Sequence, residues 1–384
     1  MPVPDAVLDD VSQLEAGDPA AMLRAIASGA AQVREAAVLA TEAGVARLAD
    51  DGRPRAVVVC GMGGSGIAGD VLAAVAGQAT PVPIVTHRGY GLPAWVGSMD
   101  LVVAVSCSGS TEETLSALEE AVRRGCRLLV VGQTGSPLDD LGQRGRAVFV
   151  PVTQGRQPRA SVWALSTPLV VAGHALGLLH APPEVVEEAA AVLEALADRC
   201  RVDAEVVVNP AKRLALELDG VLPVVWGTTP LAGTAAYRFA CQLNENAQLP
   251  ATWGALPEAN HNQVVAFDRP SAPQRSDGAR DADDFFRDRG DDEEQESGLA
   301  LVLLRDSEEH PQVAVRADVS AELARQRDLA VVELRAQGAS SFARLASLIG
   351  VTDWASAYLA LLHGTDPTPV DTITALKRRL TRGA

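Results

Sequence analysis

The chain has few cysteines, no clustered histidines and little positive charge. Its five cysteines lack the spacing of a zinc site or a disulfide framework, and its six histidines occur singly. This pattern predicts a reduced, cytoplasmic setting with no bound metal and no other cofactor. The formal net charge of −16 argues against nucleic acid or an anionic membrane as a partner, because either would require a basic surface.

Long apolar runs are also scarce. The run at 165–180, interpreted as the longest apolar run, is interrupted by Pro168, Gly173 and Gly177. It is therefore expected to be a buried helix rather than a membrane span. The acidic first ten residues do not resemble a signal peptide. With 384 residues, of which 47% are hydrophobic, the chain is expected to be soluble and long enough for two domains.

Short β-branched apolar runs alternate with helical patterns along the chain. A helical segment at 1–50 is followed by runs that predict a parallel sheet covered on both faces; they lie at 55–61, 81–87, 100–106, 126–132 and 146–152. After a helical stretch at about 161–217, the same pattern returns at 220–248, 299–306 and 328–336. We expect an α/β fold of two doubly wound parallel-sheet subdomains with flanking helices, at 51–180 and 181–384, related by duplication.

Residues 268–297 differ from the rest of the second half in composition. They are rich in like-signed charge and poor in aliphatic residues. Such a segment cannot bury enough apolar surface to order itself, so we predict a disordered acidic surface insertion.

The stretch VVVCGMGGSGIAGDVL at 57–72 is typical of a strand, a glycine loop and a helix that binds an anion. Its glycines Gly61, Gly63 and Gly66 match the dinucleotide fingerprint GxGxxG. That fingerprint also requires an acidic residue about 20 positions later, to hold the ribose. The chain instead has Thr86, His87 and Arg88 there, which disfavours a dinucleotide.

A second loop carries hydroxyl groups, with Ser106, Ser108, Ser110 and Thr111 after the strand at 100–106. Ser110 and Glu113 have the spacing of a capping box, which accounts for part of the cluster. The remaining hydroxyls and the first amides of the helix suit the oxygens of one phosphate monoester.

Five motifs in order carry a resemblance to a known family. GMGGSG and SCSGST, each after a strand, resemble the phosphosugar-binding loops of the sugar isomerase (SIS) fold. QLNENAQLP, LPEANHNQVV and GTDPTPVDTITALKRRL resemble the bifunctional phosphoglucose/phosphomannose isomerase family, and the likeness runs from about residue 55 to the end apart from the insertion. The resemblance implies that the substrate phosphate is bound by Gly64, Ser65, Ser106, Ser108 and Thr111.

The activity implied is a metal-independent aldose-ketose isomerisation. Glucose 6-phosphate, mannose 6-phosphate or both would be interconverted with fructose 6-phosphate through a cis-enediol. Glu245 is the candidate base, since it lies opposite the apolar stripe of its helix and matches the family's catalytic glutamate. His261, in the polar NHN loop, is implied to open the sugar ring from the neighbouring subunit. The partners implied are therefore a hexose 6-phosphate and a second copy of the chain, in a homodimer with its active site at the interface.

Two basic residues complete the implied site. Lys377 follows the helix-start signal of Thr368 and Pro369, and the family likeness places it at the ring-opening end of the sugar. Arg159 in QGRQPRA matches the family's arginine that supports the enediolate. The chain departs from the family at Gln248 and Gln263, where lysine and glutamate are usual.

Other functions remain open from the sequence. A phosphosugar-binding sensor would keep the fold without the chemistry, although the presence of Glu245, His261 and Lys377 argues against it. An isomerase of another sugar phosphate, including an aminosugar phosphate, is a further alternative. A nicotinamide oxidoreductase is the third.

Overall fold

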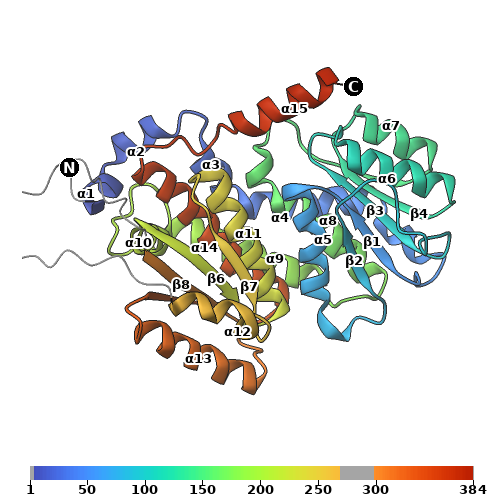
Figure 1. Cartoon of the computed structure of the whole chain (residues 1–384). Coiled ribbons are helices and arrows are strands. Elements are labelled where there is room, and N and C mark those ends of the chain that lie inside the picture. Colours follow the sequence, from blue (N-terminus) through green and yellow to red (C-terminus); the bar gives the residue numbers. More distant parts are fainter. Residues whose placement is uncertain (1–3, 269–297, 384) are drawn as a thin grey trace, which may run out of the picture.

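The computed structural model of the chain describes residues 4–268 and 298–383 (Figure 1). Of the acidic insertion predicted at 268–297, the structure describes only Asp268, so that prediction lies outside the described residues.

The first sheet has five parallel strands in the order β2-β1-β3-β4-β5. The strands are β1 (Val57–Cys60), β2 (Ile84–His87), β3 (Leu101–Ser106), β4 (Arg127–Gly132) and β5 (Val148–Pro151). Helices α5 (Gly63–Ala76) and α8 (Val162–Ala175) pack on one face, and α6 (Glu112–Arg123) and α7 (Pro137–Arg144) on the other. Because both faces are covered, the central strands are continuous apolar runs without alternation.

The second sheet has four parallel strands in the order β7-β6-β8-β9. They are β6 (Val221–Gly227), β7 (Thr252–Ala255), β8 (Gly298–Arg305) and β9 (Ala330–Arg335). One face carries α10 (Pro210–Glu217), α11 (Pro230–Asn246) and α14 (Ser341–Leu362), and the other α12 (Ala259–Asn262) and α13 (Pro311–Arg325). The sequence did not predict β7, a four-residue edge strand with two exposed residues.

The two sheets confirm the predicted α/β fold of two parallel-sheet units. The first four strands of the first sheet and the four of the second follow the same spatial order, with the second strand along the chain at the edge. This shared order supports the predicted duplication. The division into domains at residue 180 stays a prediction, since one hydrophobic cluster spans α5, α8, α9, α11 and α14.

The remaining helices join the two units. Helices α4 and α9 pack on each other, α4 also packs on α8 and α9 on α14, and the Trp163 and Phe342 rings meet at 6.0 Å between centroids. The single helical segment expected before residue 50 is divided, because Asp18 caps the next helix by accepting from the Met22 and Leu23 amides. These elements are α1 (Pro4–Asp9), α2 (Val11–Gly17), α3 (Met22–Ala27), α4 (Gly29–Glu42), α9 (Pro183–Arg199), α15 (Asp371–Gly383), η1 (Val45–Ala49), η2 (Gly77–Ala79), η3 (Pro158–Ala160) and η4 (Gln263–Asp268).

The expectation that the run at 165–180 is the longest apolar segment is wrong, because helix α14 is longer. Its 22 residues are long and apolar enough to cross a membrane by length and composition. However, 94% of its most apolar window is buried inside the protein, and core helices of soluble proteins pass the same test. The apolar run expected to form a helix at 165–180 is helical only as far as Ala175.

Candidate functional site

The two predicted phosphate loops meet at the carboxyl edge of the first sheet. Strands β1 and β3 are parallel neighbours, so the loops that follow them lie side by side. The Cys107 amide donates a hydrogen bond of 3.3 Å to Ser65 Oγ, which ties the second loop to the first. Gly64 and Ser65 therefore face the same region as the hydroxyl loop.

The glycine loop leaves the start of α5 open to an anion. Gly63 adopts a positive φ of 51°, which favours glycine. Met62 precedes the helix and its side chain makes no capping hydrogen bond. The first amides of α5 thus have no side-chain cap, the arrangement in which helix N-termini bind phosphate.

The hydroxyls of the second loop converge. Ser106 Oγ lies 3.0 Å from Thr111 Oγ1 and 3.5 Å from Ser108 Oγ. The capping box expected from Ser110 is wrong, because α6 begins at Glu112 and Thr111 precedes it. The Thr111 side chain makes no capping bond, since its hydroxyl is turned toward Ser106 instead. The cluster is thus a feature of the strand end and not of helix initiation.

The strand end that would hold the ribose of a dinucleotide carries no carboxylate of its own. Strand β2 ends at His87, and Arg88 follows it. The nearby carboxylate of Asp70, on α5, is bound by the Arg88 guanidinium and by Thr86 Oγ1 at 2.8 Å. The carboxylate near this strand end is thus already bound by two side chains, and the exclusion of a dinucleotide stays a prediction.

Arg159 and Glu245 come together beside these loops. Arg159 lies in η3, and its Nη1 donates to the backbone carbonyl of Glu245 at 2.7 Å, while its Nε is 3.7 Å from Glu245 Oε2. The Pro158 carbonyl oxygen is 3.7 Å from where a Cβ on Gly64 would stand. The Arg159 loop therefore lies over the first phosphate loop and connects it to the end of α11.

Burial shapes the acidity of this pair. The Glu245 side chain is 29% exposed and that of Arg159 is 11% exposed. Desolvation raises the pKa of Glu245, while the charges of Arg159 and Arg238 act in the opposite direction. Desolvation likewise lowers the pKa of Arg159. A carboxylate with a raised pKa is better matched to accepting and returning a proton near neutral pH.

The structure adds site residues that the sequence analysis missed. The Thr368 carbonyl accepts a hydrogen bond from Arg159 Nη2, and the Thr368 hydroxyl is buried with no hydrogen-bond partner. The sequence analysis treated Thr368 only as part of a helix start, and α15 in fact begins at Asp371. Arg238 and Asp353 form a buried ion pair behind Arg159. Asp353 could have been singled out from the sequence, because a carboxylate within an apolar helix is rarely buried without a charged partner.

His261 does not reach Glu245 within one chain. Helix α11 runs back from the carboxyl end of β6, so Glu245 lies near the amino end of the second sheet. His261 follows the carboxyl end of β7, at the opposite end of the sheet from Glu245. The stretch of α11 from Pro230 to Glu245, at ~1.5 Å per residue, separates these two ends by about 20 Å. The loop expected around His261 is wrong, since the residue lies exposed in the short helix α12.

Lys377 lies on α15, which projects from the body of the molecule near the C-terminus (Figure 1). Residues 371–380 of this helix are all exposed, including the apolar Ile373, Leu376 and Leu380. The structure therefore brings the two loops, Arg159 and Glu245 together in one chain, while His261 follows the carboxyl end of β7 and Lys377 lies on the exposed helix α15.

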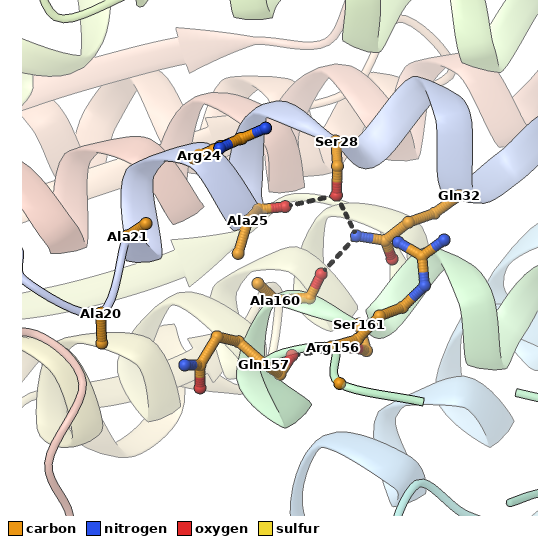
Figure 2. Close-up of a pocket in the computed structure, with 11 residues that line it drawn as sticks. Ala20, Ala21, Arg24, Ala25, Ser28, Gln32, Arg156, Gln157, Ala160 and Ser161 are labelled. Atoms are coloured by element: carbon orange, nitrogen blue, oxygen red, sulfur yellow. Dashed lines mark hydrogen bonds between the residues drawn. The ribbon is translucent and has the colours of Figure 1, made fainter. Parts of the chain in front are cut away.

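A pocket of about 280 Å³ lies beside the Arg159 loop, between α3, α4 and residues 155–161. Figure 2 shows the Gln32 amide at its wall, where Nε2 donates to Ser28 Oγ at 3.0 Å and to the Ala160 carbonyl at 2.7 Å. Gln32 is 2% exposed. A side chain of the pocket wall, Gln32, thus binds the backbone of Ala160, the residue that follows Arg159.

The amino-acid sequence of the chain is similar to those of known proteins. The family model described as the bacterial phospho-glucose isomerase C-terminal SIS domain matches residues 207–380. A bifunctional phosphoglucose/phosphomannose isomerase of Caldicellulosiruptor bescii is 33% identical over 325 residues, covering 84% of this chain and 89% of that protein. One of Aquifex aeolicus is 30% identical, covering 86% and 92%. A D-glucosamine-6-phosphate 4-epimerase of Sulfolobus acidocaldarius is 31% identical over 208 residues, covering 54% and 62%.

Solved structures agree on the fold. A glucose-6-phosphate isomerase of Chlamydia trachomatis superposes with a TM-score of 0.69 at 13% identity, covering 99% of this chain and 84% of that chain. A hypothetical protein of Thermus thermophilus gives a TM-score of 0.67 at 16% identity, covering 99% and 95%. At these identities the likeness concerns the fold alone.

Proposed function

The chain belongs to the bifunctional phosphoglucose/phosphomannose isomerase family, and from that premise we propose that it interconverts glucose 6-phosphate and mannose 6-phosphate with fructose 6-phosphate. The observation that carries this proposal is the contact of Arg159 with Glu245 beside two loops suited to one phosphate. A partly buried carboxylate next to a fixed positive charge is what an enediol mechanism requires.

In the proposed mechanism, the first sheet holds the phosphate and the second supplies the base. Gly64, Ser65, Ser106, Ser108 and Thr111 bind the phosphate oxygens of the open-chain sugar. The Glu245 carboxylate removes the C2 proton of the aldose, and that C–H electron pair forms the C1–C2 double bond.

Negative charge then develops on the sugar oxygen O1, where the Arg159 guanidinium stabilises it. After a proton moves from O2 to O1, Glu245 returns its proton to C1 and the C2 carbonyl forms. The planar enediol carries no stereochemistry at C2, so the reverse reaction yields glucose or mannose 6-phosphate according to the face that Glu245 reprotonates.

Ring opening is assigned to His261 and Lys377, and we propose that His261 comes from the partner in a homodimer. The distance along α11 supports this, because His261 cannot serve the Glu245 of its own chain. The exposed apolar residues Ile373, Leu376 and Leu380 of α15 also suit an interface between copies. The five cysteines are free thiols, which supports the proposed cytoplasmic setting.

A second candidate is an enzyme of aminosugar phosphates. The likeness to the D-glucosamine-6-phosphate 4-epimerase, at 31% identity over 208 residues, favours it over other sugar phosphates. That likeness covers only 54% of the chain, whereas the isomerases of Caldicellulosiruptor bescii and Aquifex aeolicus cover 84% and 86% of it.

The test is a panel of hexose, aminosugar and pentose phosphates in deuterated water, read by nuclear magnetic resonance with and without a chelator. We expect fructose 6-phosphate to yield glucose and mannose 6-phosphates with deuterium at C2, unaffected by the chelator. Epimerised aminosugar phosphate as the sole product would favour the second candidate. Ligand-dependent thermal stabilisation without any product would make the protein a sensor.

A further inference from the structure

A buried ion pair stands directly behind the Arg159 loop. Arg238 of α11 binds Asp353 of α14 with two hydrogen bonds, Nε to Oδ1 at 2.9 Å and Nη2 to Oδ2 at 2.7 Å. Their side chains are 2% and 5% exposed. Arg238 Nη2 also donates to the backbone carbonyl of Arg159 at 2.8 Å.

We propose that Arg238, held by Asp353, is a positioning residue that sets the place of Arg159 and the charge around Glu245. The inference rests on the proposed function for its catalytic consequence. Neither residue touches the reacting atoms in this proposal, so both act through Arg159 and Glu245.

The geometry explains why the positioning requires an arginine. The two oxygens of Asp353 bind Nε and one hydrogen of Nη2, which fixes the plane of the guanidinium. The second hydrogen of Nη2 then points in a set direction and meets the Arg159 carbonyl. A lysine at this position carries the charge but cannot hold both partners in one plane.

The Arg159 loop depends on such outside support. The short element η3 spans only Pro158–Ala160, so it has little hydrogen bonding of its own. Its two last carbonyls are held by buried side chains from different parts of the chain, the Arg159 carbonyl by Arg238 and the Ala160 carbonyl by Gln32. With its backbone fixed in this way, Arg159 extends its guanidinium to Glu245 and Thr368.

The same pair affects the charge at Glu245. The groups that face this carboxylate are Arg159 from η3 and Arg238 and Cys241 from α11, while Asp366 faces Arg159 from the segment before α15. The positive charge of Arg238 lowers the pKa of Glu245 against the effect of burial. Removing that charge raises the pKa further, so the acid limb of kcat/KM moves to higher pH.

A matched control exists on α14. Arg344 and Asp306 form another buried pair, with Nε to Oδ1 at 2.8 Å and side chains 4% and 3% exposed. Arg344 also binds the Ala339 carbonyl and Glu308, at the carboxyl edge of the second sheet. It therefore resembles Arg238 in burial and charge but supports a different part of the molecule.

The experiment compares Arg238→Lys, the apolar double variant Arg238→Met/Asp353→Leu and the control Arg344→Lys in the full chain. We measure kcat, KM and their pH profiles with fructose 6-phosphate, together with thermal unfolding. In both Arg238 variants we expect kcat to fall about 100-fold, the size of losing one preorganised donor, with KM changed less than about 3-fold. The acid limb of the kcat/KM profile moves to higher pH in the double variant, which lacks the positive charge of Arg238. The control loses thermal stability and keeps kcat and its pH profile.

Amide hydrogen exchange of residues 155–161 separates this inference from the proposed function. Exchange there should become faster in Arg238→Lys and stay unchanged in Arg344→Lys, whether or not the wild-type protein turns over a hexose phosphate. A folded Arg238 variant with wild-type kcat, or with wild-type exchange at 155–161, overturns the positioning role. If the double variant does not fold, the lysine variant alone decides.

Discussion

The two sheets have the same strand order, yet their carboxyl ends hold different chemistry. In the first sheet, β1 and β3 are followed by glycines and hydroxyls that leave helix amides and side-chain oxygens available. In the second, the corresponding strands β6 and β8 are followed by Thr228 and Asp306, which are buried and already bonded.

The carboxyl end of the second sheet is occupied by charged side chains of the protein itself. Thr228 Oγ1 donates to Glu309 at 2.6 Å, and Glu309 also binds the Arg305 guanidinium at 2.8 and 3.0 Å. Asp306 accepts from Arg344 at 2.8 Å. An outside anion would have to compete with these internal carboxylates.

The difference shows that topology sets where a parallel sheet can bind, while the local side chains decide whether it does. In the proposed function, the first sheet binds the phosphate at its carboxyl end. The second contributes Glu245 from its amino end, through the last turn of α11. Four substitutions test this division of labour.

The largest effect is expected at Glu245. Replacing it by glutamine removes the proton acceptor while keeping the shape, so turnover of fructose 6-phosphate should fall about 10²- to 10⁴-fold. Binding of the sugar phosphate, measured by calorimetry, should survive because the phosphate loops belong to the other sheet. Turnover at the wild-type rate would remove Glu245 from the mechanism.

Asp306→Asn should have a large effect of another kind. It removes the buried charge partner of the Arg344 guanidinium and leaves it only the exposed Glu308, so the free energy of unfolding should fall by up to about 3–5 kcal/mol in denaturant titrations. KM for fructose 6-phosphate should stay unchanged in the folded fraction. A raised KM with normal stability would mean that the second strand end also binds substrate.

A paired substitution gives the smallest expected effects. Thr111→Val removes one hydroxyl from the phosphate cluster, and KM should rise about 10-fold with little change in thermal stability, as for the loss of a hydrogen bond to a charged group. Thr228→Val at the other sheet should instead cost about 1–3 kcal/mol of stability, because it leaves Glu309 short of a buried donor. The contrast would fail if both variants changed KM alike.

Much of the fold could be predicted from local patterns. Each predicted apolar run contains the core of a strand, because buried parallel strands need continuous β-branched residues. The four-residue β7 was missed since it is too short and too exposed to produce such a run. The start of α15 and the cap of α6 were misplaced by one to three residues, because several hydroxyls near each start could serve as the cap.

The sequence by itself determined the two sheets and the glycine and hydroxyl loops that follow β1 and β3, since glycines and hydroxyls directly after apolar strands are neighbours along the chain. Only the tertiary structure decided that Arg159 meets Glu245, 86 residues away, and that Arg238 is held by Asp353, 115 residues away. No local periodicity encodes those contacts. They arise because helices α11 and α14 pack against each other and α11 is hydrogen-bonded to the Arg159 loop, which brings charges from distant segments together.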